Sequence, residues 1–104
     1  MDLPFNTTIS NIKGAFYTNY SNFKTAKVEK LYIVNYQSIG ADDIELWISN
    51  DGREVPLLKT IMAINTLIEF VGPLYLNESD MLIGRTSNTH GNVTVSIQGV
   101  MVNK

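Results

Sequence analysis

Apolar and polar residues alternate with a period of two along much of this chain. From Ile44 to Ser49, isoleucine and leucine occupy every second position, and polar or aromatic residues stand between them. The stretch Val93–Val102 begins with the same alternation of valine and isoleucine with threonine and serine. A period of two is that of a half-buried β-strand, whereas no stretch of ten residues shows the 3.6-residue stripe of a helix. Val, Ile and Thr, which favour strands, supply 28 of the 104 residues.

The alternation and the turn residues between its segments predict a chain built from strands alone. The expected strands are Gly14–Thr18, Thr25–Asn35, Ile44–Ser49, Val55–Met62, Thr66–Phe70, Leu74–Leu76, Met81–Arg85 and Val93–Val102. Gly72-Pro73 is expected to interrupt the chain between the fifth and the sixth of these. We therefore predict an all-β fold, a single antiparallel β-sandwich of jelly-roll type with seven to eight strands. Residues 1–11 are expected to form an N-terminal arm, and residues 12–104 the sandwich domain.

Three local irregularities can be predicted inside this pattern. The inward positions change from even to odd between Val28 and Leu31, which indicates a β-bulge near Glu29–Lys30. The segment Asn50–Arg53 contains Asp-Gly, which tolerates the positive φ angles of a tight hairpin turn. Gly99 stands inside the last strand and marks a bulge or a close approach of another backbone.

Length, charge and hydropathy restrict the class of protein. A chain of 104 residues is one domain, and 44% apolar with 17% charged residues argues against intrinsic disorder. The net charge is −2 and the basic residues are scattered, so we expect no nucleic-acid partner. No apolar run approaches the ~20 residues of a membrane span, and no signal peptide is recognisable. We expect no membrane association and synthesis in a cytoplasm.

The reactive side chains do not form a catalytic or metal-binding motif. The chain has no cysteine and one histidine, His90, which has no nearby carboxylate to orient it and is expected on an exposed loop. Asp42, Asp43 and Glu45 lack the ligand spacing of a calcium loop and are interpreted as helping to end a turn. No nucleophile elbow or phosphate-binding loop occurs. We predict a protein that is not an enzyme, with no cofactor and no small-molecule ligand.

Large apolar residues at outward positions suggest a surface that contacts other proteins. Four aromatic residues gather between Phe16 and Phe23, and Trp47 lies opposite the inward face of its strand. Clustered apolar groups on a surface mark interaction sites, and Trp and Tyr anchor interfaces. The predicted interface residues are Phe5, Tyr17, Tyr20, Phe23, Trp47, Leu67 and Val71. Two other interpretations stay open: loops or the N-terminal arm cover these groups, or the aromatic residues form a carbohydrate-binding platform.

From Phe16 to Val102 the chain resembles small bacteriophage virion β-sandwich proteins. The matching elements, in order, are Tyr17, Lys24-Thr25-Ala26, Val28, Ile33-Val34-Asn35, Glu69-Phe70, Gly72-Pro73-Leu74, Leu76, Asp80, Val93-Thr94-Val95-Ser96 and Gly99-Val100. Each element is a common strand or turn, and their order carries the resemblance. The chain departs from the family pattern at Asn19–Phe23, where a proline-glycine turn is usual, and at Ser79, where a glycine is usual.

The resemblance implies a non-enzymatic structural protein of the virion. The first expectation is a capsid decoration or cement protein that binds the capsid lattice in many copies. A tail, baseplate or fibre component is the first alternative, and a carbohydrate-binding module for host-surface recognition is the second. The expected partners are other virion proteins, the major capsid protein or tail proteins, and further copies of the chain in a homo-oligomer.

Overall fold

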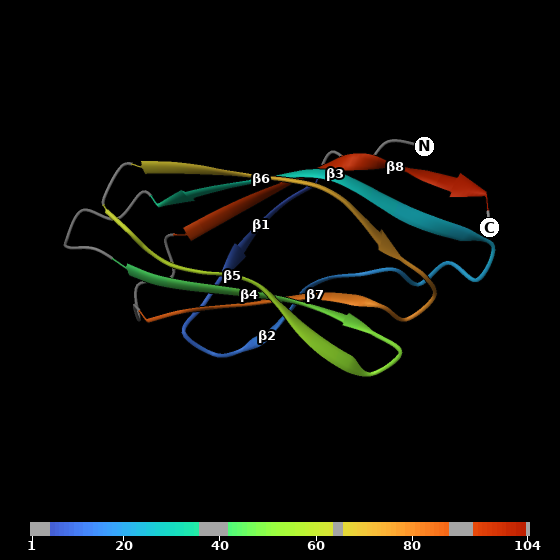
Figure 1. Cartoon of the computed structure of the whole chain (residues 1–104), viewed down its shortest axis with the longest axis horizontal. Coiled ribbons are helices and arrows are strands. Elements are labelled where there is room, and N and C mark those ends of the chain that lie inside the picture. Colours follow the sequence, from blue (N-terminus) through green and yellow to red (C-terminus); the bar gives the residue numbers. More distant parts are fainter. Residues whose placement is uncertain (1–4, 36–41, 64–65, 88–92, 104) are drawn as a thin grey trace.

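The computed structural model describes residues 5–35, 42–63, 66–87 and 93–103 and is built of strands joined by short connections (Figure 1). The eight strands are β1 (Phe5–Ile9), β2 (Gly14–Thr18), β3 (Lys24–Asn35), β4 (Asp42–Asn50), β5 (Arg53–Met62), β6 (Thr66–Leu76), β7 (Met81–Thr86) and β8 (Val93–Asn103). These residues contain no helix. The predicted all-β class and strand number are confirmed.

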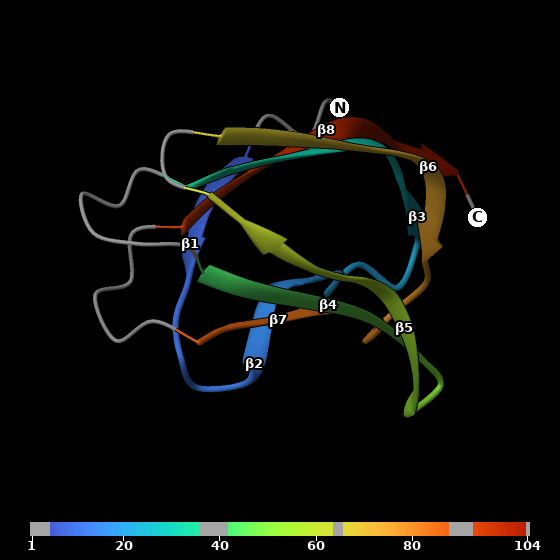
Figure 2. The same cartoon turned by 60° about the vertical axis from the view of Figure 1, so that its left-hand side comes forward.

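The strands form two antiparallel sheets of four, stacked as two layers. One sheet has the order β1-β8-β3-β6 and the other the order β2-β7-β4-β5. Figure 1 shows β8, β3 and β6 in the upper layer and β5, β4, β7 and β2 in the lower layer, and Figure 2 shows both sheets twisting. β6 and β5 end their sheets and are joined by the short connection 63–65, so the two edge strands lie on the same side of the sandwich.

The N-terminal arm is not confirmed. Residues 5–9, which lie inside the predicted arm, form β1 and pair with β8 from Phe5 opposite Ile97 to Ile9 opposite Val93. The sequence pattern missed this strand because Thr7 takes one of its inward positions, and Ile9 is its only inward apolar residue that the structure describes. Pairing with β8 therefore makes a strand of a segment too polar to be recognised by its hydrophobic period.

The bulge in β3 and the close approach at Gly99 are confirmed and belong together. The register of β3 shifts between Val28 and Lys30 against both of its neighbours, β6 and β8. Gly99 lies opposite Val28 at this shift, and a Cβ atom there would collide with the carbonyl oxygen of Lys27. Glycine lets the β8 backbone pass this close to the bulged strand.

The predicted interruption at Gly72-Pro73 is wrong, since β6 runs without a break from Thr66 to Leu76. An edge strand tolerates proline because one side of its backbone has no neighbouring strand to receive an N–H group. β6 pairs only with β3 among the described strands. At Gly72 a Cβ atom would lie 2.5 Å from the carbonyl oxygen of Val28, so glycine permits the contact with the β3 bulge.

The core lies between the two sheets and includes the inward residues predicted from the alternation, together with Ile9, Phe16, Met62, Leu76 and Leu82. Ala26, Val28, Leu31 and Ile33 of β3 and Val93, Val95 and Ile97 of β8 are fully buried and face Ile44, Leu46 and Leu82 of the other sheet. Burial of aliphatic side chains of this size contributes about 1.5–3 kcal/mol each relative to exposure. The hairpin at Asn50–Arg53 is confirmed, with φ of 55° at Asp51 and 75° at Gly52.

Candidate protein interface

The exposed apolar side chains of the described residues concentrate on the two neighbouring edge strands. Of the eight large hydrophobic residues that are strongly exposed, five lie on β5 and β6. These five, which we name the β5–β6 flank, are Val55, Ile61, Leu67, Val71 and Tyr75, and between 46% and 70% of each is exposed. Single exposed apolar residues are ordinary, but five on two edge strands at one side of the sandwich make this side a candidate for contact with another protein.

The inward side chains of the sandwich are also less completely buried at the β5–β6 flank than in its centre. The inward residues Leu58 of β5 and Ile68 and Phe70 of β6 pack against the core but remain partly exposed. At the opposite edges, by contrast, Ile9 of β1 and Phe16 of β2 are buried. Within the described strands, β5 pairs only with β4 and β6 only with β3. The backbone groups along both edges therefore have no neighbouring strand among those described. The apolar side chains beside them are only partly buried.

Two of the predicted interface residues, Leu67 and Val71, belong to this flank. Val55, Ile61 and Tyr75 were not predicted. Alternation could have identified Ile61 and Tyr75, whereas Val55 lies opposite the buried Ile48, beyond a register shift in β5. In β6 the exposed residues occupy every second position, with Leu67 at the start and Tyr75 near the end. The sequence could not show that β5 and β6 are both edges on one side of the molecule, because that depends on the strand order.

The predicted aromatic residues Tyr20 and Phe23 lie in the connection between β2 and β3 and are 85% and 77% exposed. An open depression of about 350 Å³ beside them is lined by Ala15, Phe16, Tyr17, Thr18 and Tyr20. The connection begins at Asn19, which is buried and whose side chain donates to the carbonyl oxygens of Lys24 at 3.0 Å and Leu76 at 2.8 Å. Tyr20 and Phe23 are therefore displayed on a loop that is anchored to the sandwich.

A buried carboxylate, Asp80, joins the connections at this end of the molecule. Its Oδ2 accepts hydrogen bonds from the Asn50 side chain at 2.8 Å and from the Asn77 backbone N–H at 2.9 Å. Its Oδ1 accepts one from the Asp51 backbone N–H at 3.0 Å. In addition, Asn19 donates its backbone N–H to the Asp80 carbonyl oxygen. The contacts thus connect the β4–β5 hairpin, the β6–β7 turn and the connection 19–23 that carries Tyr20 and Phe23.

The electrostatic effect of this arrangement is a pKa of Asp80 that lies below its ordinary value of 3.8. Burial by itself raises this pKa, but the hydrogen bond from Asn50 and those from the backbone N–H groups of Asp51 and Asn77 stabilise the charged form and outweigh it. Asp80 is therefore ionised near neutral pH although it is only 5% exposed. Its role is structural, because all three hydrogen bonds tie chain segments together.

Tyr17 and Trp47 are partly covered by their own chain. The Tyr17 ring packs against the core, its hydroxyl donates to the Met101 sulfur at 4.0 Å, and burial raises its pKa. Trp47 lies on the outer face of β4, where the Lys13 Nζ atom sits 4.3 Å from the ring centroid. Lys13 in turn forms an ion pair of 2.6 Å with Glu54. Tyr17 and Trp47 are therefore both partly exposed and partly covered by side chains of their own chain.

Replacing Trp47 by alanine is expected to lower the free energy of unfolding by about 1–2 kcal/mol without unfolding the domain. The ring is partly buried, loses its contact with the Lys13 ammonium and lies outside the core between the sheets. Urea denaturation followed by circular dichroism measures the change, and Tyr20→Ala, which removes a more exposed ring, is the control. An unfolded Trp47→Ala protein would show that this residue belongs to the core.

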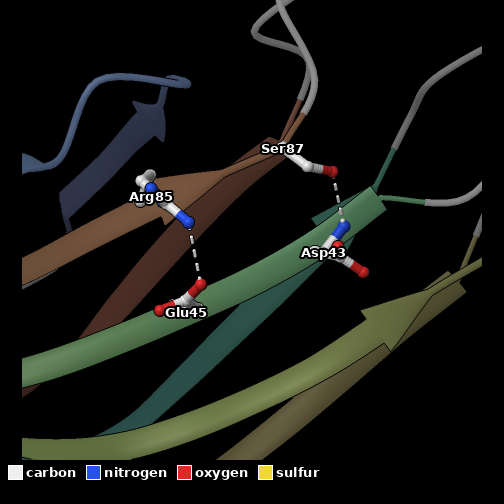
Figure 3. A network of polar contacts seen from close by, with 4 residues as sticks. All are labelled: Asp43, Glu45, Arg85 and Ser87. Carbon is white, nitrogen blue, oxygen red and sulfur yellow. Dashed lines mark hydrogen bonds and ion pairs between the residues drawn. The ribbon is translucent and has the colours of Figure 1, made fainter.

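Several sequence predictions fall on residues for which no side-chain position is described. His90 lies outside the described residues, and so do the side chains of Phe5 and Asp42. Figure 3 shows the neighbouring acidic residues: the Asp43 backbone N–H donates to the Ser87 hydroxyl at 2.9 Å, and Glu45 pairs with Arg85 at 3.0 Å. The Glu45–Arg85 pair joins β4 to β7 across the outer face of the second sheet. The Asp43–Ser87 hydrogen bond joins β4 to the residue that follows β7.

The part of the chain that the structure describes contains no group of three or more His, Cys, Asp or Glu side chains that could hold a metal ion. No helix long and apolar enough to cross a membrane occurs in it. Comparison of the sequence with protein-family models and with curated proteins finds no match. The exposed apolar and aromatic side chains of the described residues gather at the β5–β6 flank and on the connection 19–23, which carries Tyr20 and Phe23.

Proposed function

We propose that this protein is a non-enzymatic structural component of a bacteriophage virion, most directly a capsid decoration or cement protein that binds the capsid lattice in many copies. The observation that carries the proposal is the β5–β6 flank, where five large apolar side chains lie exposed on two adjacent edge strands. A surface of this kind is stabilised by association with other proteins. The resemblance of Phe16 to Val102 to small virion β-sandwich proteins supplies the virion as the place of assembly.

The strand pairing also supports the proposal, because it is the pairing expected of a jelly roll. A jelly roll is a long antiparallel hairpin of eight strands, with the first paired to the last and so on inward, rolled into two sheets. The pairs β1–β8, β2–β7, β3–β6 and β4–β5 are all present. We therefore interpret the sandwich as a jelly roll, an architecture used by viral capsid proteins and also by lectins.

Imaging of the phage particle that encodes the chain tests this function. Cryo-electron microscopy of purified particles is expected to show the eight-stranded sandwich as repeated density on the capsid surface, with the β5–β6 flank buried in contacts. Particles made without the gene serve as the control and should lack that density. Density confined to the tail, baseplate or fibres would replace the capsid position by the first alternative. Absence of the chain from purified particles would refute a virion role.

One observation favours a second candidate function, the recognition of host-surface carbohydrate. The open depression beside β2 is lined by three aromatic residues, Phe16, Tyr17 and Tyr20, and aromatic rings are suitable platforms for sugar rings. A glycan array probed with the purified protein is expected to give specific binding that Tyr20→Ala abolishes. Uniformly negative arrays would eliminate this candidate and leave the assembly function in place.

A further inference from the structure

The partner that fits the β5–β6 flank best is a second copy of the same chain. The outward faces of β5 and β6 carry opposite charges, each next to exposed apolar residues. In β5 the outward residue Lys59 stands two positions before the exposed Ile61. Leu57 lies at a register shift between β4 and β5 and packs against the core. In β6 the sequence Leu67-x-Glu69-x-Val71 places an anion between two apolar residues. Lys59, Ile61, Leu67, Glu69 and Val71 are exposed, whereas Leu57 is partly buried.

The two charged residues lie at matching heights on the flank. Lys59 stands three positions before Met62, where β5 ends, and Glu69 stands three positions after Thr66, where β6 begins. The short connection 63–65 joins these two ends. At ~3.3 Å per residue, both charged residues therefore lie about 10 Å from the same end of the flank. They belong to different sheets, and no ion pair joins them within the described part of the chain.

We propose that two copies associate through this flank about a two-fold axis that passes between Lys59 and Glu69. Rotation by 180° about an axis perpendicular to the flank places β6 of one copy beside β5 of the second. Each Glu69 then meets a Lys59 of the other copy, and this happens twice, because a two-fold contact is self-complementary. The same rotation brings Ile61 opposite Val71. The inference rests on the proposed assembly function, for which it names the partner.

The geometry of the edges agrees with this arrangement. The rotation turns the outer face of β5 to the same side as the outer face of β6, so both charged rows lie on one continuous surface. Proline, which would remove a backbone donor, stands at positions 56 and 73 and is absent from residues 57–62 and 66–71. These two segments, parallel to each other in the pair, can therefore add strand to strand. The second copy also covers inward side chains that are partly exposed in a single copy, namely those of Leu58, Ile68 and Phe70.

The existing contacts of the charged residues do not oppose the proposal. Glu69 lies 3.8 Å from Lys30, and the two side chains are 44% and 42% exposed. An ion pair this exposed is weak, about 0–1 kcal/mol, and Glu69 retains oxygen atoms for a second cation. Lys59 lies opposite Glu45 in the β4–β5 register, but Glu45 pairs with Arg85 at 3.0 Å.

Charge exchange tests the pairing, with sedimentation velocity of the full chain as the measurement. The unmodified protein is expected to show a concentration-dependent dimer. Lys59→Glu and Glu69→Lys each place two like charges across the contact and are expected to weaken the dimer by at least about tenfold. An equimolar mixture of the two single variants regains both opposite-charge pairs in the mixed dimer and is expected to recover association. The double variant Lys59→Glu/Glu69→Lys is expected to recover it as well.

A matched pair of isoleucine variants tests the apolar part of the contact. Ile61→Asp on the flank is expected to abolish dimer formation, whereas Ile12→Asp, at a residue of similar exposure outside the flank, leaves it unchanged. The melting temperature of every variant checks that the domain is folded. A protein that stays monomeric at all concentrations, or a mixture of charge variants that associates no better than each alone, would overturn the proposed dimer. Incorporation of such a monomer into particles would still support the proposed function.

Discussion

Asp80→Ala is expected to lower the free energy of unfolding by about 3 kcal/mol, because it removes the acceptor of three hydrogen bonds at once. Asn50 and the backbone N–H groups of Asp51 and Asn77 would lose their partner at a site that is 5% exposed in the wild type. Loss of this carboxylate also releases the β4–β5 hairpin from the β6–β7 turn. Urea denaturation near neutral pH measures the effect, and Glu78→Ala, at an exposed neighbour, is expected to change stability by less than about 0.5 kcal/mol.

The stabilisation by Asp80 is also expected to depend on pH. The pKa of Asp80 in the folded protein lies below its ordinary value of 3.8, so the folded state binds this proton less tightly than the unfolded state. The carboxylate therefore contributes its full stabilisation above the unfolded pKa and loses it as the pH falls through the folded pKa. The stability gap between the wild type and Asp80→Asn should be large at about pH 6 and should narrow below about pH 3.8. A gap that is independent of pH would contradict the role of the charged form.

Gly99→Ala is expected to cost about 3 kcal/mol of stability, which is at the upper end for overpacking. The added methyl group would collide with the Lys27 carbonyl oxygen and lie 3.0 Å from the Val28 Cα atom, both of which belong to backbone that cannot rotate away. The β8 strand would have to separate from the β3 bulge, and the register on both sides of it would be disturbed.

Gly14→Ala provides the matched control for the glycine prediction. Gly14 also lies in a strand, but the nearest atom to an added Cβ is the Ile12 carbonyl oxygen at 3.9 Å, an ordinary contact distance. This variant is expected to be neutral within about 0.5 kcal/mol. Thermal denaturation of the two variants side by side measures the difference, and equal melting temperatures would refute the close approach at Gly99.

Much of the strand pattern could be predicted because the sheets bury one face. A period of two identified the inward residues of β3, β4 and β8, since each of these inner strands has a neighbour on both sides and a fully buried row. The even-to-odd change after Val28 located the bulge, because the extra residue that β3 has relative to β8 moves the inward row by one position. The Asp-Gly pair located the hairpin through its positive φ angles.

The errors of prediction occur at the edges of the sheets. β1 has polar residues at most positions and is a strand because β8 offers it a partner. β6 continues through Pro73 because its outer side has no neighbouring strand within the described residues. In both cases the secondary structure depends on the place of the strand in the sheet, which local propensity does not contain.

The sequence by itself determined that the chain forms a strand-rich domain with outward apolar groups and no recognisable catalytic motif. Only the tertiary structure decided which of those groups lie on the same side of the sandwich. Leu67 and Val71 join Val55, Ile61 and Tyr75 because β5 and β6 end their two sheets on the same side, whereas Trp47 receives cover from Lys13. Alternation specifies which way a side chain points within its strand. The order of the strands, which arises from pairings between distant segments, specifies what lies next to it.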